Sequence, residues 1–239
     1  MLQTSDMREI ILRGIVRANM RHVAWTKNHW VSDYGAEGLI QVLIAEEIYE
    51  AGGGDLGVFL EPNVSEFCDE IEAKSLVDVD IKPAFRPDIC TYTRGDKVPH
   101  IIEVKRRWEK GPIAQDVIRC ANFVSILKNM GLEATYCAIF LHDDGARDRG
   151  HKKAFFQRVD EEPIAAKKRV EELLQDWARE VLQTSNSDHS GVRIRAEVGR
   201  EYGFELKSDW PTEDWMEGAE CELFRWRPAT IEFSRRDTD

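Results

Sequence analysis

The sequence has no long apolar run, no paired-cysteine motif and no repeated or low-complexity segment. No stretch approaches the roughly 18 consecutive apolar residues that a membrane-spanning helix needs. The first residues, MLQTSDMREIILRGIV, lack the basic region and long apolar run of a signal peptide. The five cysteines are scattered without a C-x-x-C pair, which argues against a zinc ribbon and against a disulfide scaffold. We therefore expect a cytoplasmic protein in which Cys90, Cys120 and Cys137 are buried free thiols.

Several enzyme classes are disfavoured because their motifs are missing. The glycine run GGGDLG at 52–57 fits neither G-x-x-x-x-G-K-[ST] nor G-x-G-x-x-G, so we interpret it as a helix end and a turn. The sequence has no G-x-S-x-G elbow, and its histidines show neither H-x-x-x-H nor H-E-x-x-H spacing. His142, Asp143 and Asp144 end a predicted strand, where aspartates are typical of a turn.

The charge balance is acidic. Of the 239 residues, 32% are charged, and the net charge is −11 at pH 7. A general nucleic-acid coating protein is usually basic, so the charge disfavours that class. It does not exclude a nucleic-acid enzyme, because a local basic patch or a partner subunit can supply the phosphate contacts.

The hydrophobic pattern predicts an α/β protein. From residue 36 onward the predicted order is helix, three strands, helix, strand. An earlier helix precedes this core, and a further helix follows it. The segment 66–80 is ambiguous between a short helix and an excursion. The predicted helices cover 6–27, 36–51, 112–130 and 163–183, and the predicted strands cover 58–64, 88–93, 100–107 and 134–144.

Four regions follow from this pattern. Residues 1–30 form an N-terminal helical segment, and residues 31–144 form the core. Residues 145–183 hold a basic loop and a helix that packs on the core. After a linker, residues 191–239 contain four short strand-like runs, VRIRAEV, YGFELKS, CELFRWR and ATIEFSR. We interpret them as a small β-rich region that packs on the core or carries a function of its own.

Two charges lie inside a strand that should be buried. In HIIEVKRR (100–107), alternation places Glu103 and Lys105 on one face and Ile102 and Val104 on the other. Charged side chains are rarely buried without a partner or a function. Asp88 begins the preceding strand, and a hairpin through RGDK (94–97) would bring it beside them. The sequence thus predicts a cluster of Asp88, Glu103 and Lys105.

Two carboxylates and a lysine are suited to phosphodiester hydrolysis. Carboxylate oxygens are ligands for Mg²⁺ or Mn²⁺, and one or two such ions would polarise a phosphate and activate a water. The lysine would orient that water or stabilise the charge that develops on the phosphate. The structural alternative is an ion pair between Glu103 and Lys105 without catalytic function.

The residues RPDI (86–89) and EVK (103–105), on adjacent predicted strands, resemble the motif of the PD-(D/E)XK phosphodiesterase superfamily. Many restriction enzymes and repair nucleases belong to this superfamily. The resemblance covers roughly residues 31–144 and implies a restriction-endonuclease-like core of helix, three strands, helix and strand. A second E-x-K, at Glu205 and Lys207, has no preceding PD strand and no following amphipathic helix, so it is a weaker candidate.

The resemblance also implies two further site residues. Members often carry a glutamate on the helix before the sheet that faces the metal. Glu37 is our choice for this further metal ligand, with Glu46 and Glu47 as alternatives. Many relatives carry a glutamine on the helix after the lysine, which matches Gln115. The RecB-like branch has a tyrosine four residues later, where this chain has Arg119. The resemblance is therefore to the superfamily and not to that branch.

Basic residues near the motif are candidates for phosphate contacts. Trp108 would stack on a base or cap the core, and we favour the core. The candidate nucleic-acid-binding residues are Arg106, Arg107, Lys110, Arg147, Arg149, Lys152 and Lys153.

The implied function is a Mg²⁺- or Mn²⁺-dependent nuclease, with DNA favoured over RNA. Restriction, phage defence, mobile-element processing and repair are the roles that the resemblance suggests. A protein partner that supplies recognition or activation, and a homodimer, are both open. The alternative is a catalytically inactive module of the same fold that binds nucleic acid or a protein.

Overall fold

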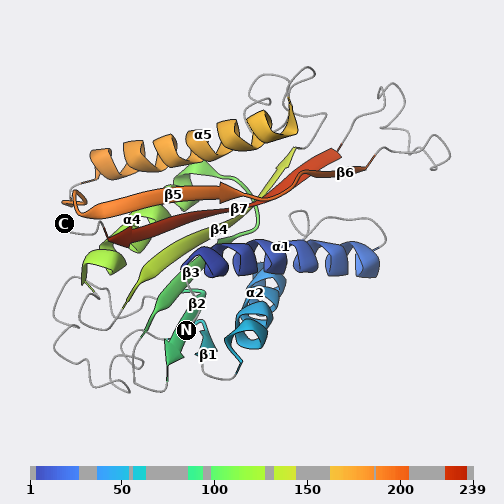
Figure 1. The fold of residues 1–239 in the computed structure, drawn as a ribbon, viewed down its shortest axis with the longest axis horizontal. Coiled ribbons are helices and arrows are strands. Elements are labelled where there is room, and N and C mark those ends of the chain that lie inside the picture. The colour runs from blue at the N-terminus through green and yellow to red at the C-terminus, as the bar shows by residue number, and fades with distance from the viewer. Residues whose placement is uncertain are drawn as a thin grey trace.

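The computed structural model describes residues 4–26, 37–53, 56–62, 86–93, 98–126, 132–143, 162–185, 187–204 and 224–235. These ranges form an α/β fold, in which one mixed parallel and antiparallel sheet has helices on both faces (Figure 1). The helices are α1 (Thr4–Thr26), α2 (Glu37–Gly52), α4 (Lys110–Ile126) and α5 (Pro163–Thr184). The strands are β1 (Leu56–Leu60), β2 (Ile89–Thr93), β3 (His100–Lys105), β4 (Ala134–Asp143), β5 (Val192–Val198), β6 (Tyr202–Phe204) and β7 (Phe224–Arg235).

The described part of the sheet has seven strands in the order β1-β2-β3-β4-β7-β5, with β6 also paired to β7. The β3–β4 pair is parallel, and α4 supplies the crossover between these strands. The other described pairs are antiparallel. The predicted order of helix, three strands, helix and strand is present as α2, β1, β2, β3, α4 and β4.

Two hydrophobic cores enclose the sheet, one on each face. Helices α1 and α2 cover a face to which β3 contributes Ile102 and Val104. Helices α4 and α5 cover the opposite face, to which β4 contributes Cys137, Ile139 and Leu141. Because both faces of β4 are buried, its sequence is apolar almost without interruption. The predicted burial of Cys90, Cys120 and Cys137 as free thiols is confirmed.

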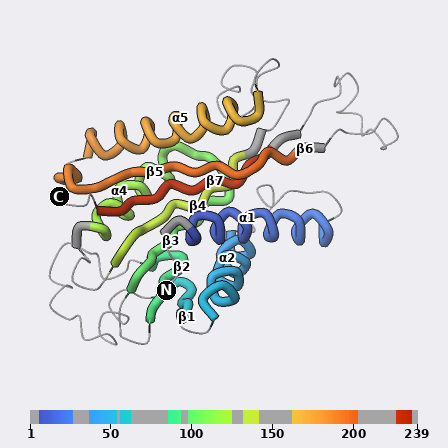
Figure 2. The backbone as a smooth tube through the Cα atoms, in the orientation of Figure 1, coloured from blue at the N-terminus to red at the C-terminus, as the bar shows by residue number. Residues whose placement is uncertain are grey.

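The C-terminal strands belong to the central sheet. Strand β7 pairs with β4 over ten residues from Ala134 to Asp143, and β5 pairs with the other side of β7. The backbone trace shows β7 running between β4 and β5 (Figure 2). The sequence predicted two separate runs at 221–227 and 229–235, but the structure has one strand from Phe224 to Arg235 that passes through Pro228.

Pro228 is tolerated inside β7 because of its position along the strand. The Pro228 carbonyl accepts a hydrogen bond from Gly199 N at 2.8 Å, so its carbonyl and ring nitrogen face the β5–β6 side. On that side β5 has ended at Val198 and β6 has not begun, so no ladder hydrogen bond is lost. A Cβ on Gly199 would lie 2.5 Å from Pro228 Cγ, which explains the glycine. Pro228 therefore lies within β7 without interrupting it.

The N-terminal helix is part of the same folded unit. Met7, Ile11 and Ile15 of α1 are buried in the core that α2 and the sheet share. Arg8 is also buried, and it forms ion pairs with Glu197 of β5 and Glu232 of β7. No helix within the described ranges is both long enough and apolar enough to cross a membrane.

Some predictions fall outside the described residues. They concern the segment 66–80, the turn 94–97, Asp144, the basic residues Arg147, Arg149, Lys152 and Lys153, and the second E-x-K at Glu205 and Lys207.

Candidate active site

The predicted cluster forms where β2 and β3 lie beside each other. The β2–β3 register pairs Ile89 with Ile102 and Cys90 with Ile101, and its continuation sets Asp88 opposite Glu103. Val104 N donates a hydrogen bond of 2.6 Å to Asp88 Oδ2. The pairing expected from a hairpin therefore brings Asp88 to the EVK segment.

Asp88 has a second partner that the sequence did not indicate as functional. Gln41, buried on α2, donates from Nε2 to Asp88 Oδ1 at 2.9 Å. Burial raises the pKa of the Asp88 carboxyl, although the hydrogen bond from Val104 and the charge of Lys105 act in the opposite direction. The two hydrogen bonds fix the orientation of this carboxyl group and leave lone pairs on both oxygens for a cation.

Glu103 is more deeply buried than Asp88, with 2% of its side chain exposed. Its Oε2 lies 3.4 Å from Arg119 Nη2 on α4. Its Oε1 is buried and has no hydrogen-bond partner among the described residues. Burial raises the pKa of Glu103 to about 8, and this rise is opposed by Arg119 and reinforced by Asp88. A buried oxygen without a partner calls for a water or an ion to satisfy it, so Oε1 is a candidate metal ligand.

Lys105 is held by a carboxylate from the neighbouring helix. Its Nζ lies 3.1 Å from Asp116 Oδ2 and 3.8 Å from Glu37 Oε1. It also donates to the Val104 carbonyl at 3.1 Å. The ammonium group is thus placed among the acids of the site, with 20% of the side chain exposed.

Glu37, at the first position of α2, lies at the cluster. Its Oε2 accepts a 3.4 Å hydrogen bond from Arg106 N, in addition to the Lys105 contact. The alternatives Glu46 and Glu47 lie further along α2, where they bind Arg17 of α1 at 3.0 and 2.5 Å. Among the three glutamates, the geometry brings Glu37 to the cluster and leaves the others in a helix–helix contact.

Gln115 is exposed, and its neighbour Asp116 takes the inward position on α4. Asp116 was not predicted, although the sequence contained a signal for it. The apolar stripe of α4 runs through Ile113, Val117 and Cys120, and Asp116 falls within that stripe three residues after Ile113. A buried carboxylate on an apolar helix face requires a cation, and here the cations are Lys105 and Arg119.

The basic residues after the motif have varied surroundings. Arg107 Nε lies 3.7 Å from Glu109 Oε1, Arg106 is half-buried and Lys110 is exposed. Trp108 packs edge-on against Trp177 of α5, with ring centroids 4.8 Å apart. The preferred interpretation of Trp108 as a core-capping residue is therefore confirmed.

The residues present fit a magnesium-type site built from few protein ligands. No group of three or more His, Cys, Asp or Glu side chains in the described ranges is close enough to hold a metal ion. Mg²⁺, however, usually binds through one or two carboxylates and keeps waters or substrate phosphates as its other ligands. Asp88, directly before β2, and Glu103, opposite it on β3, would provide such a pair.

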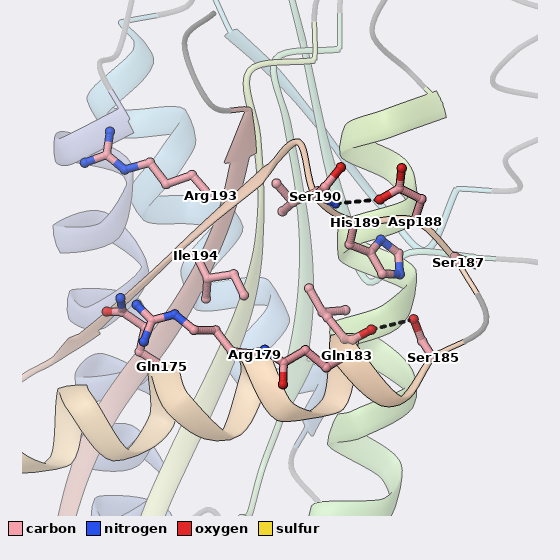
Figure 3. A pocket seen from close by; sticks show the side chains of 12 residues that line it. Gln175, Arg179, Gln183, Ser185, Ser187, Asp188, His189, Ser190, Arg193 and Ile194 are labelled. Atoms are coloured by element: carbon pink, nitrogen blue, oxygen red, sulfur yellow. Dashed lines mark hydrogen bonds between the residues drawn. The ribbon is translucent and has the colours of Figure 1, made fainter.

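A separate pocket lies at the other end of the α4–α5 face. It has a volume of about 570 Å³ and lies between the end of α5 and the start of β5 (Figure 3). Arg179, His189 and Arg193 are among its lining residues, and no residue of the carboxylate cluster contributes to it.

Comparison of the chain with protein-family models, with curated proteins and with solved structures found no match.

Proposed function

We propose that this chain is a metal-dependent nuclease of the PD-(D/E)XK type. The observation that carries the proposal is the convergence of Asp88, Glu103 and Lys105 from adjacent strands, with one buried oxygen of Glu103 lacking a partner among the described residues. A structural ion pair between Glu103 and Lys105 would not leave that oxygen unpaired. Lys105 instead pairs with Asp116 at 3.1 Å.

The architecture supports the same proposal. The core order of α2, three strands, α4 and β4 agrees with the restriction-endonuclease-like arrangement that the motif implies. The EVK segment ends β3, which is the strand parallel to β4. We propose that residues 31–144 form such a core and that β5 and β7 extend its sheet.

Each residue has a proposed role in phosphodiester hydrolysis. Asp88 and Glu103 would hold Mg²⁺ or Mn²⁺, which when bound polarises the phosphate and lowers the pKa of a coordinated water. Lys105 would donate to that water or to the phosphate oxygen that gains charge. Gln41 and the Val104 amide orient Asp88, and Glu37 stands beside Lys105.

DNA is the proposed substrate, in a cytoplasmic setting such as restriction, phage defence, mobile-element processing or repair. Arg106, Arg107 and Lys110 follow the motif directly and are the described candidates for contacts with the phosphate backbone. Phosphate contacts release counterions, so cleavage should weaken as salt is raised. Salt also screens the repulsion between DNA and a chain with a net charge of −11, which reduces this salt dependence.

The test is cleavage of supercoiled plasmid, linear duplex and single-stranded DNA with Mg²⁺ or Mn²⁺. Wild type is compared with Asp88→Asn, Glu103→Gln and Lys105→Met, which preserve side-chain size. Lys168→Met and Glu172→Gln are matched controls, because this pair lies on the exposed face of α5 at 3.8 Å. Cleavage that all three site variants lose and both controls keep would support the proposal. Cleavage that survives in the site variants would refute it.

An inactive module of the same fold is the second candidate. It is favoured by Arg119, a cation that already contacts Glu103, and by the lack of a three-ligand group in the described part of the chain. A module of this kind would bind DNA without metal and would cut none of the substrates. If millimolar Mn²⁺ raises the Tm of wild type but not that of Glu103→Gln, the chain binds metal through Glu103. That result would exclude the metal-free module.

A further inference from the structure

Arg119 occupies a bridging position between two buried acids. Its Nη2 lies 3.4 Å from Glu103 Oε2 and also contacts Asp116 Oδ1. The side chains of both acids are 2% exposed, whereas Arg119 is 39% exposed. The guanidinium group therefore enters the cluster from the solvent side and ends on its most buried carboxylates.

Asp116 anchors this arginine through a short connection within α4. Asp116 and Arg119 are three residues apart on one helix, so their side chains meet on the same face. The other oxygen of Asp116 lies 3.1 Å from Lys105 Nζ. Asp116 thus contacts both cations of the cluster, and it would still hold Arg119 if Arg119 moved away from Glu103.

Arginine is charged at every accessible pH, so Arg119 always favours the ionised form of Glu103 against the effect of burial. A divalent ion bound by Glu103 would lie close to the guanidinium group, and two cations at one carboxylate repel each other. The same ion would also replace the charge that Arg119 now supplies to Glu103. Metal and arginine therefore compete for one carboxylate.

We propose that Arg119 is a resident counter-ion that holds Glu103 in a metal-free state and must move from it when a divalent metal binds. The inference rests on the proposed function, because it takes Glu103 as a metal ligand. It adds a regulatory step: metal loading depends on displacement of a side chain that α4 supplies. Substrate phosphate, which attracts arginine strongly, would favour that displacement.

Calorimetric titration of Mn²⁺ tests the inference without any cleavage assay. Arg119→Met removes the charge at similar length, and Arg119→Lys keeps it. The matched control is Arg179→Met, because Arg179 forms the same i,i+3 pair with Asp176 on α5, remote from the cluster. We expect Mn²⁺ to bind Arg119→Met roughly tenfold more tightly than wild type, Arg119→Lys in between, and Arg179→Met as wild type.

The outcomes separate this inference from the proposed function. Wild-type binding that Glu103→Gln abolishes, with no gain in Arg119→Met, would overturn the competition and leave the metal site standing. No binding by wild type or by Arg119→Met would overturn both proposals. Should Arg119→Met fail to fold, Arg119→Gln replaces it, since a neutral polar side chain suits this partly exposed position and the same gain is expected.

Discussion

The ammonium group of Lys105 lies 3.1 Å from the carboxylate of Asp116, which α4 places inside its own apolar stripe. This contact joins the motif on β3 to the helix that crosses over to β4. Lys105 therefore depends for its position on a residue outside the motif. Contacts from residues outside a catalytic motif to the motif itself commonly determine how well a catalytic group is oriented.

Asp116→Asn should reduce DNA cleavage by about 10- to 100-fold, because the amide cannot hold the ammonium of Lys105 as a carboxylate does. The loss should appear in kcat more than in KM for DNA, since Asp116 is buried and does not face the substrate. Steady-state kinetics measure it. Asp176→Asn, which breaks the exposed pair with Arg179, is the control and should cut normally. Equal rates for Asp116→Asn and wild type would contradict the role.

The metal-free protein should lose stability as the pH rises from about 6.5 to about 8. The pKa of Glu103 is raised to about 8 in the folded state, so the folded chain keeps a proton that the unfolded chain has released. Raising the pH in this window therefore favours unfolding. Between about pH 4 and 6.5, His100 has the opposite effect on stability. Burial lowers the pKa of His100 from 6.5 to about 4, so in this range the unfolded chain binds a proton that the folded chain does not.

Urea denaturation at several pH values in EDTA measures this effect. The variant Glu103→Gln isolates the contribution of Glu103, because its amide does not titrate. The free energy of unfolding of this variant should stay constant over the pH range in which that of wild type falls. The fall should be of order 1–2 kcal/mol between pH 6.5 and 8, at 1.4 kcal/mol per pH unit for one proton. Parallel curves for the two proteins would show that Glu103 does not titrate in this range.

Gly14→Ala should destabilise the fold by about 1–3 kcal/mol through overpacking between α1 and α2. A Cβ at Gly14 would lie 2.6 Å from Ile44 Cα and 2.9 Å from Ile44 N, and backbone atoms cannot turn away. Gly38→Ala is the control, because a Cβ there meets nothing within 4 Å among the described residues. Thermal unfolding should show a lower Tm for Gly14→Ala alone. A Tm equal to that of Gly38→Ala would refute the close packing.

Arg8→Ala should cost about 3–5 kcal/mol, because it leaves Glu197 and Glu232 without their buried cation. Arg13→Ala should cost less than about 1 kcal/mol, since Arg13 is 55% exposed and Glu47 keeps Arg17 as a partner. Chemical denaturation of the two variants gives the comparison. A similar loss of unfolding free energy in both variants would mean that the buried ion pairs of Arg8 do not stabilise the packing of α1 on the sheet.

Local sequence patterns were sufficient for the elements of the core. The helices predicted at 36–51 and 112–130 are present as α2 and α4, and the strands at 88–93 and 100–107 are present as β2 and β3. Periodicity of apolar residues determines these elements, because each must bury one face. The convergence of Asp88 with Glu103 also followed from the sequence, since a hairpin aligns the residues that flank its turn.

Contacts between distant segments could not be predicted in the same way. Arg8 meets Glu232 across 224 positions, and Gln41 meets Asp88 across 47. The two C-terminal runs form one strand because β5 ends at Val198, so no partner strand requires a hydrogen bond from the nitrogen of Pro228. The position at which β5 ends cannot be inferred from the residues around Pro228.

The sequence by itself determined the elements of this protein and the motif at its centre, since periodicity and short-range pairing depend on near neighbours. The tertiary structure alone decided the surroundings of that motif. The apolar stripe of α4 indicated that Asp116 faces inward, but only the packing of α4 against β3 made it the partner of Lys105 and brought Arg119 to Glu103. Periodicity sets which side of a helix is buried, whereas the residue of another element that lies opposite depends on how the two elements pack.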